Sequence, residues 1–100
     1  MIFCFVCHDG ADAATLRQTH LQAHLDHIET VLDRMPVAGP VPGGEDAGYR
    51  GSIVMIEAET EQEARDLFNR DPYAKAAIWD KVEVYPFKAV AGRWVGGKTW

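Results

Sequence analysis

Three segments of the chain carry apolar patterns that are typical of β-strands. Ile2 to His8 is apolar at nearly every position, which predicts a central strand that is buried on both faces. Gly51 to Ala58 has a fully apolar centre, and Lys81 to Phe87 alternates charged and apolar residues as a half-buried strand does. A shorter extended piece, Val37 to Val41, is interrupted by a Gly-Pro pair. The pattern therefore predicts three clear strands and a short one.

A long amphipathic helix is expected between the first strand and this short piece. Asp12 can cap its first turn, and the helix runs from Ala13 to about Arg34. Apolar residues at helical spacing predict its buried stripe, which consists of Leu21, Leu25, Ile28 and Leu32.

A second helix is expected after Thr60. The Thr60 hydroxyl and Glu63 form a capping-box pattern, in which each side chain binds a free amide of the other residue. Three apolar residues then predict its buried side, namely Ala64, Leu67 and Phe68. Beyond Asp71-Pro72-Tyr73, one more helical turn is expected from Ala74 to Ile78.

The elements follow in the order strand, helix, strand, strand, helix, strand. This is the ferredoxin-like βαββαβ arrangement of an α+β protein, in which two helices cover one face of an antiparallel sheet. The strands are too apolar to leave the other face in water, so we expect a homodimer in which a second copy covers it. Residues 1–88 are expected to form the domain, and the tail from Ala89 to Trp100 to dock at or beside the dimer interface.

Composition and charge exclude several classes of partner. A chain with 47% hydrophobic and 25% charged residues is ordinary for a soluble globular domain. The net charge of −5 and the scattered basic residues argue against nucleic acid, because phosphate binding uses clustered Lys and Arg. No apolar run approaches the ~20 residues of a membrane helix, and no signal-peptide pattern follows Met1. We therefore expect a cytoplasmic protein without a nucleic-acid or membrane partner.

The two cysteines, Cys4 and Cys7, form a C-x-x-C pattern inside the first strand. A redox motif places its first thiol at a helix N-terminus, where the thiol pKa is lowered. In a strand the two side chains point to opposite faces. We interpret them as structural cysteines.

His20, His24 and His27 share one side of the long helix, which raises the question of a metal. Helical histidines four residues apart can bind zinc, but a catalytic site needs a further ligand and H-E-x-x-H is missing from the sequence. The phosphate-binding patterns G-x-x-x-x-G-K and G-x-G-x-x-G are missing too. We expect neither a metal nor another cofactor.

Asp71 precedes a proline at the end of the second helix. Pro72 cannot continue that helix and holds Asp71 in an extended or turn conformation. A carboxylate on such a rigid turn can take part in a site, although forming the turn is the commoner role of an aspartate before proline.

His24 lies at the border of the apolar stripe of the long helix. With Leu21 at zero on a helical wheel, His24 is at about −60° and Arg17 at about −40°. His20 and His27 are at about −100° and about −120°, so we expect them to face water. The alternative interpretation of His24 is a boundary histidine that is hydrogen-bonded to the backbone.

We expect His24 and Asp71 to meet in one pocket as an acid/base pair. The carboxylate would fix one imidazole nitrogen and raise the basicity of the ring. Imidazole titrates near neutrality, which suits general acid/base chemistry.

Several short segments, taken together in this order, resemble the YCII-related (YciI-like) family. They are Ala23-His24-Leu25, Ala38-Gly39-Pro40, Gly51-Ser52-Ile53-Val54, Asp71-Pro72-Tyr73 and Val84-Tyr85-Pro86-Phe87-Lys88. The resemblance implies a dimeric α+β barrel, in which two ferredoxin-like protomers pack sheet against sheet, and a His-Asp pair that maps onto His24 and Asp71. One branch of the family resembles dehydrochlorinases of chlorinated trihydroxybenzenes, and the wider superfamily includes muconolactone isomerases. The Arg-Pro that often precedes the family's histidine is missing here, and Arg17 is the nearby arginine.

We predict a small cofactor-free enzyme that carries out proton transfer, isomerisation or an elimination such as dehydrochlorination. Its substrate would be a small aromatic or lactone-like molecule. His24 would be the general base and Asp71 its orienting partner, while Arg17, Ser52 and Tyr73 would position the substrate. Two alternatives stay open, a non-catalytic ligand-binding module that uses the same pocket and an assembly subunit that docks through its tail.

Overall fold

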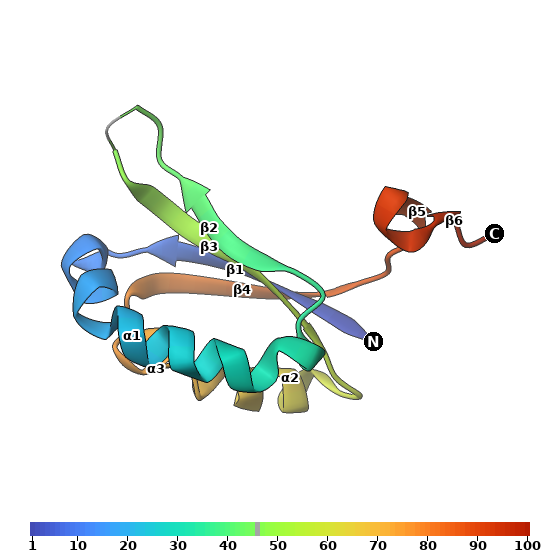
Figure 1. Cartoon of the computed structure of the whole chain (residues 1–100), viewed down its shortest axis with the longest axis horizontal. Helices are drawn as coiled ribbons and strands as arrows, with labels where there is room; N and C mark the ends of the chain where they lie inside the picture. The colour runs from blue at the N-terminus through green and yellow to red at the C-terminus, as the bar shows by residue number, and fades with distance from the viewer. Residues whose placement is uncertain (46) are drawn as a thin grey trace.

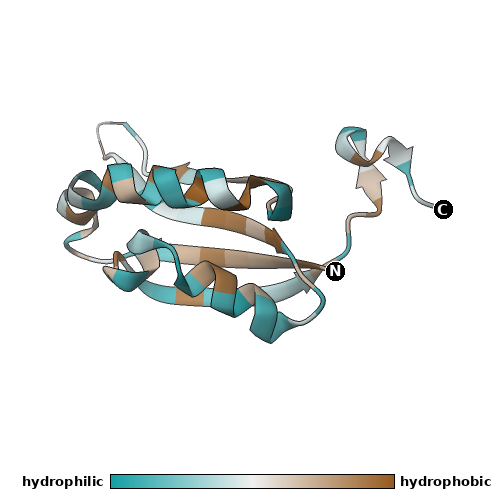
Figure 2. Cartoon of the chain, turned by 60° about the horizontal axis from the view of Figure 1, so that its bottom comes forward, coloured by the Kyte–Doolittle hydropathy of each residue, from teal (hydrophilic) through white to brown (hydrophobic). Residues whose placement is uncertain are grey.

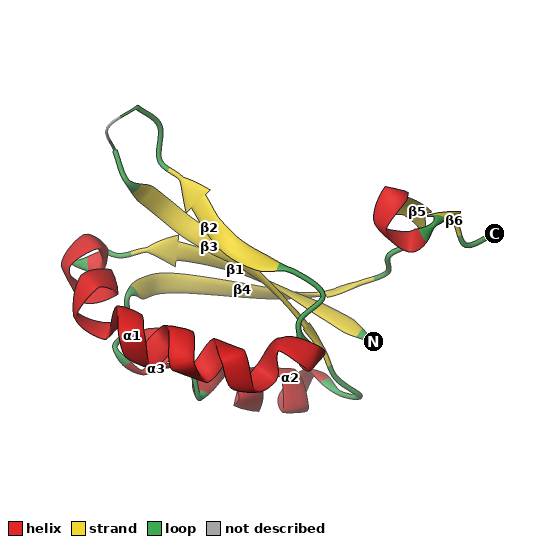
Figure 3. Ribbon diagram, in the orientation of Figure 1, coloured by secondary structure: helices red, strands yellow, loops and turns green. Residues whose placement is uncertain are grey.

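The computed structural model describes residues 1–45 and 47–100 and contains a four-stranded antiparallel sheet with the order β2-β3-β1-β4. Figure 3 shows the strands in yellow, and their bounds are β1 (Ile2–Asp9), β2 (Ala38–Pro42), β3 (Tyr49–Glu57) and β4 (Trp79–Phe87). The apolar β1 is a central strand, as predicted. β4 begins at Trp79, ahead of the alternating pattern that starts at Lys81.

The helices lie on one side of this sheet and leave the other side uncovered (Figure 1). They are α1 (Ala13–Val31), which continues into the 3₁₀ turn η1 (Leu32–Arg34), α2 (Glu61–Asn69) and α3 (Pro72–Lys75). The short helix begins at Pro72 and not at Ala74 as expected, because proline fits the first helical position, where its missing N–H is not needed. Within the described residues, no helix is long and apolar enough to cross a membrane. The chain has the ferredoxin-like α+β fold that the element order predicted.

The tail forms a small unit of its own beyond β4. It contains β5 (Ala91–Gly92), the 3₁₀ turn η2 (Arg93–Val95) and β6 (Gly97–Lys98), and its two strands pair with each other. In Figure 1 this unit projects past the end of the sheet. Trp94 and Trp100 are 78% and 74% exposed. Docking of the tail at a dimer interface stays a prediction.

An aromatic core lies between the sheet and the helices. Phe3, Phe5 and Cys7 alternate along β1 and are buried on the side of the helices. The ring of Phe5 stacks on Phe68 of α2 with 4.4 Å between centroids, and Phe68 stacks on Trp79 at 5.3 Å. Figure 2 shows the corresponding hydrophobic bands along the strands. These stacked rings join β1, α2 and β4 into one core.

The buried stripe predicted for α1 is wrong in its orientation. Leu21, Leu25 and Leu32 are 46%, 45% and 59% exposed. The buried and half-buried residues lie on a neighbouring face of the helix: Ala13, Leu16, Arg17, His20, His24, His27, Ile28 and Val31. This face is centred about 80° from Leu21 on the helical wheel. The expectation that His20 and His27 face water is therefore also wrong, since both are half-buried.

The helix caps differ from their predicted form. The Thr60 hydroxyl accepts a hydrogen bond from the Glu63 amide at 3.1 Å, as a capping box requires. The Glu63 carboxylate, however, binds the Arg34 guanidinium at 2.5 Å and not the Thr60 amide. Asp12 makes no side-chain cap on α1. Half of the predicted capping box is formed, and the Asp12 cap is not.

The two cysteine side chains point to opposite faces of β1, as expected. Cys7 is buried under the helices and Cys4 is half-buried on the open face. Burial raises the pKa of the Cys4 thiol, and burial together with the nearby Asp9 carboxylate raises that of Cys7 to about 12. A thiol with such a pKa forms almost no thiolate at neutral pH and is a poor nucleophile.

We therefore expect iodoacetamide at pH 8 to leave Cys7 unmodified in the native protein. Mass spectrometry of the intact protein measures this, and alkylation in denaturant, where both thiols react, is the control. Rapid modification of Cys7 without denaturant would contradict the structural interpretation of this residue.

Candidate functional site

His24 and Asp71 meet in direct contact where α1 passes the start of α3. The Nδ1 atom of His24 lies 2.7 Å from Oδ1 and 2.9 Å from Oδ2 of Asp71. Asp71 has φ −64° and ψ 128°, the extended conformation that a following proline favours, and its Oδ1 accepts the Tyr73 amide at 2.9 Å. Asp71 thus caps α3 and binds His24 with one carboxylate. The backbone-bonded alternative for His24 does not describe this side chain.

The hydrogen-bond geometry assigns different tasks to the two imidazole nitrogens of His24. A carboxylate accepts hydrogen bonds, so Nδ1 carries the proton in this pair. Within the described part of the chain, Nε2 has no hydrogen-bond partner. The ring is also held in place by stacking on Tyr73, with 3.8 Å between centroids and 2° between the planes. Nε2 is thereby left with a lone pair on an immobilised ring.

Tyr73 connects the pair to the first turns of α1. Its hydroxyl donates to the backbone oxygen of Arg17 at 3.0 Å. Burial raises the pKa of Tyr73; the nearby Arg17 guanidinium opposes the rise and the Asp71 carboxylate adds to it. Tyr73 therefore keeps its proton at neutral pH and acts as a neutral hydrogen-bond donor.

Arg17 is bound by a carboxylate that the sequence analysis missed. Its Nε and Nη2 atoms donate to the two oxygens of Asp9 at 3.0 Å and 2.8 Å. Nη2 also reaches the Gly51 carbonyl at 3.2 Å and the Ser52 hydroxyl at 3.1 Å. Arg17 is therefore part of an ion pair and not an isolated cation.

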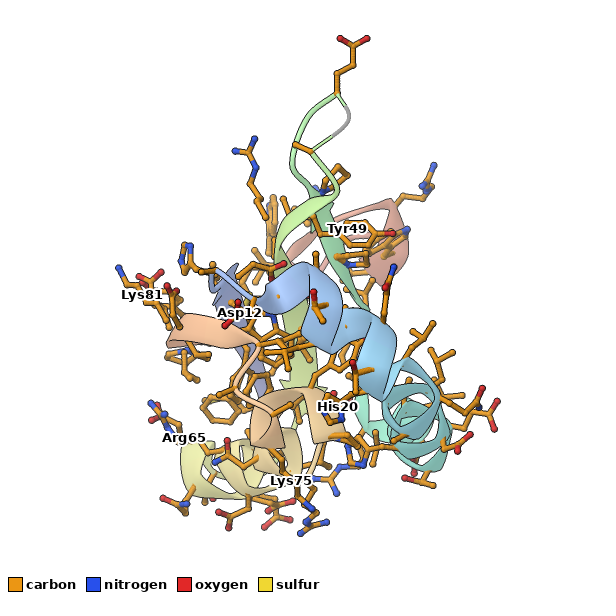
Figure 4. The ribbon with its side chains drawn as sticks, turned by 90° about the vertical axis from the view of Figure 1, so that its left-hand side faces the viewer. Asp12, His20, Tyr49, Arg65, Lys75 and Lys81 are labelled. Atoms are coloured by element: carbon orange, nitrogen blue, oxygen red, sulfur yellow. The ribbon has the colours of Figure 1, made fainter. Side chains whose placement is uncertain are left out.

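The Arg17 guanidinium also lies between two tyrosine rings. Its central carbon is 5.1 Å from the centroid of Tyr49 and 5.7 Å from that of Tyr73. Both distances lie within the range of cation–π attraction. Figure 4 views the molecule from this end, with Tyr49 of β3 near the first turns of α1.

A cavity of about 240 Å³ brings these groups together. Its polar wall consists of Arg17, His24, Ser52, Asp71 and Tyr73, and its apolar wall includes Leu25, Ile28, Met35, Pro40, Val54 and Trp79. Pockets for drug-sized ligands measure about 300–1,000 Å³, so this cavity suits a single small ring. Every site residue predicted from the sequence lines it.

Sequence reasoning missed Asp9 and Tyr49. An aspartate before a glycine is typical of a turn, and a tyrosine at a strand start carries no signal of its own. Trp79 also lines the cavity, and its indole Nε1 is buried without a hydrogen-bond partner among the described residues.

Of the three histidines on α1, His24 is the one that lines the cavity. Among residues 1–45 and 47–100, no three His, Cys, Asp or Glu side chains are grouped so that they could hold a metal ion. Nδ1 of His24 is hydrogen-bonded to Asp71.

Comparison with known proteins identifies relatives of this chain. The chain is 33% identical over 97 residues to Protein YciI of Escherichia coli O6:H1, covering 90% of this chain and 99% of that protein. It is 38% identical over 80 residues to an uncharacterised Haemophilus influenzae protein, covering 75% and 80% of the two chains. A solved structure is 27% identical with a TM-score of 0.80, over 93% of this chain and 97% of the other. That protein is the 5-chloro-2-hydroxyhydroquinone dehydrochlorinase TftG of Burkholderia phenoliruptrix AC1100, in complex with 2,5-dihydroxybenzoquinone. The model of the YCII-related domain matches residues 1–88, and the chain belongs to the YCII-related family.

Proposed function

We propose that this protein is a small enzyme that removes a proton from a hydroxylated ring, with His24 as the general base. The observation that carries the proposal is the two-oxygen contact between Asp71 and Nδ1 of His24, at 2.7 Å and 2.9 Å, which leaves Nε2 as the reactive nitrogen. A base that is oriented by a carboxylate through its other ring nitrogen is a recurring device of acid/base catalysis. Asp71 also stabilises the imidazolium that forms when Nε2 takes up a proton.

The proposed reaction is a β-elimination or an isomerisation that needs no cofactor. In elimination, a proton leaves the substrate for Nε2 of His24 and its electron pair forms a new double bond in the ring. A leaving group such as chloride departs with the pair of its bond to carbon, so the net loss is HCl. In isomerisation the same nitrogen returns the proton to another ring atom.

The substrate class follows from the two walls of the cavity. The apolar wall suits the carbon skeleton of one ring, and the Ser52 hydroxyl and the Arg17 guanidinium can donate to its oxygen substituents. The Tyr73 hydroxyl donates its own proton to the Arg17 backbone oxygen, so toward a substrate hydroxyl it can act as an acceptor. TftG acts on a chlorinated hydroxyhydroquinone, which supports this class. We infer that this chain takes a hydroxylated, aromatic or quinone-like ring, with Arg17, Ser52 and Tyr73 as substrate-positioning residues.

Release of chloride from 5-chloro-2-hydroxyhydroquinone tests this function. The purified protein should release one chloride per substrate, faster than buffer, under argon to prevent oxidation of the hydroquinone. Ion chromatography measures the chloride. If the protein accelerates neither this reaction nor proton exchange on a panel of hydroxyquinones, the proposal that it is an enzyme is wrong. Tight binding of the same compounds without turnover would instead favour the ligand-binding alternative.

We also propose that the protein is a homodimer whose sheets pack face to face. The strand register places a mostly apolar set of residues on the open face of the sheet: Ile2, Cys4, Val6, Ile53, Met55, Tyr85 and Phe87. Four polar residues share this face. Glu83 binds His8 at 2.8 Å and accepts the Tyr85 hydroxyl at 2.6 Å, while Glu57 and Lys81 lie exposed toward its two ends. The Tyr85 hydrogen bond, followed by that of His8, lowers the pKa of Glu83. Burying this face therefore leaves few polar groups unsatisfied.

Sedimentation equilibrium at micromolar concentration should show a dimer, and Ile53→Lys should convert it to a monomer. A lysine in the middle of the open face would have to lose its hydration in the interface. Leu21→Lys is the matched control, because Leu21 is similarly exposed but lies on α1, so that this variant should stay dimeric. A monomeric wild-type protein at these concentrations would refute the dimer.

A further inference from the structure

We propose that Asp9 is a positioning residue, which holds Arg17 and Ser52 as a subsite for an anionic ring oxygen. The inference rests on the proposed function of the His24 cavity. It adds which group of the ligand binds at the other end of the polar wall, next to Arg17 and Ser52.

Asp9 reaches the site because of its place at the end of β1. The pairing of β1 with β4 shifts in register between His8 and Asp9. Strand alternation directs Asp9 to the same side as Phe5 and Cys7, the side on which α1 lies. The side chains of Asp9 and Arg17 are only 9% and 12% exposed. The ion pair is therefore a built part of the protein interior and not a surface contact.

The bidentate contact determines which Arg17 atoms stay available. Nε and Nη2 are occupied by Asp9, and Nη2 is shared with Gly51 and Ser52. Nη1 has no hydrogen-bond partner in the described part of the chain. With the guanidinium plane held by two parallel hydrogen bonds, Nη1 keeps one fixed direction.

The same contact makes Ser52 a hydrogen-bond donor toward the cavity. The Ser52 oxygen accepts from Nη2 of Arg17 at 3.1 Å, so its own proton must be donated elsewhere. Among the described residues no acceptor takes that proton. Ser52 is 6% exposed and lines the cavity. A ligand oxygen is the partner that would satisfy it.

The charges define the chemical class of the ligand group. Asp9 offsets the charge of Arg17, and Asp71 faces His24 from the other end of the polar wall. The subsite thus offers two donor groups, Nη1 of Arg17 and the Ser52 hydroxyl, without a large excess of positive charge. Such donors suit a phenolate or enolate oxygen, whose negative charge grows as Nε2 of His24 removes a proton from the ring.

Asp9→Asn separates this role from a merely structural one. Asparagine replaces one carboxylate oxygen by an NH₂ group, which would oppose the N–H groups of Arg17 and break the bidentate contact. The probe is 2,5-dihydroxybenzoquinone, whose ring hydroxyls are acidic and whose visible spectrum reports their ionisation. Calorimetry gives its Kd. The spectrum is recorded at an acidic pH at which the free probe is only partly ionised, and it shows whether the bound form is more ionised than the free form.

We expect the wild-type protein to bind the probe in its ionised form. Asp9→Asn also removes the charge that offsets Arg17, but we expect the loss of a fixed donor direction to outweigh this effect. Kd should rise about tenfold or more, as on loss of a hydrogen bond that involves a charged group, and the spectrum of the bound probe should shift toward the protonated form. Ser52→Ala, which leaves the ion pair intact, should cause the same spectral shift and keeps the test valid if Asp9→Asn does not fold. Asp12→Asn is the matched control: Asp12 is exposed, lies near Asp9 in the chain and makes no side-chain cap, so its Kd should stay within about twofold of wild type.

Each arm of the experiment can overturn the subsite. It is refuted if the wild-type protein does not bind the probe, if folded Asp9→Asn binds it with unchanged Kd and spectrum, or if Ser52→Ala does so. Asp9→Asn is also introduced into the His24→Gln variant, so that failure of the subsite can be distinguished from failure of the proposed function. Dependence on Asp9 should persist there even though no proton can be taken up at residue 24, and chloride release tests His24 independently.

Discussion

Replacing His24 with glutamine should lower kcat for chloride release by about 10²–10⁴-fold, the usual contribution of a general base. Glutamine can still donate to Asp71, but it has no basic nitrogen in the position of Nε2. Binding of 2,5-dihydroxybenzoquinone should change much less than the rate, because the donors of Arg17 and Ser52 remain. Steady-state kinetics and calorimetry on the same preparation measure the two effects.

Asp71→Asn should lower the rate of chloride release because it changes the imidazole of His24, and not because a contact with the substrate is lost. An asparagine can present its NH₂ group to Nδ1 and favour the wrong tautomer of His24, with the proton on Nε2.

The matched control for His24→Gln is His20→Gln, because His20 is also a half-buried histidine of α1 but does not line the cavity. Wild-type activity in His24→Gln, or an equal loss in His20→Gln, would contradict the assignment of the base.

Gly51→Ala should destabilise the protein by about 1–3 kcal/mol, the usual cost of forcing extra atoms into a packed region. A Cβ atom on Gly51 would lie 2.1 Å from the backbone oxygen of Cys7 on the neighbouring strand β1. Since that atom belongs to the backbone, the two central strands would have to separate. The carbonyl of Gly51 would then also move relative to Nη2 of Arg17, which it binds at 3.2 Å.

Urea unfolding at a fixed protein concentration measures this change, and the melting temperature should fall by about 4–8 °C for each kcal/mol in a domain of this size. Gly39→Ala is the control, because no atom of the described residues, apart from Gly39 and its two chain neighbours, lies within 4 Å of the Cβ position there. A fully stable Gly51→Ala variant would show that β1 and β3 do not require this close approach.

The fold could be predicted from the sequence because its strands and turns carry local signals. The apolar run of β1 identified the central strand, and Thr60 marked the start of α2. Pro72 held Asp71 extended through the steric restriction on the residue before proline, which acts within a few atoms of the chain. Such local effects can be evaluated without knowledge of the partner elements.

The orientation of α1 could not be predicted in this way. A helical wheel assumes that the most apolar side is buried, which points to Leu21 and Leu25. The structure instead turns Arg17 and His24 inward, where Asp9 and Asp71 bind them. Charged partners offset the cost of burying polar groups, and hydrophobicity alone does not reveal partners that lie far away in the chain.

By itself, the sequence determined the order of the elements, the antiparallel sheet with one open face, and a carboxylate held at the end of α2. Only the tertiary structure decided which side of α1 is buried, that Asp9 binds Arg17, and that Arg17 donates to the Ser52 hydroxyl. Asp9, Arg17 and Ser52 come from β1, α1 and β3, so their contacts depend on how the strands pair and how the helix lies on them. Hydrogen bonds act over about 3 Å, and a pattern along one chain cannot specify distances between separate elements at that scale.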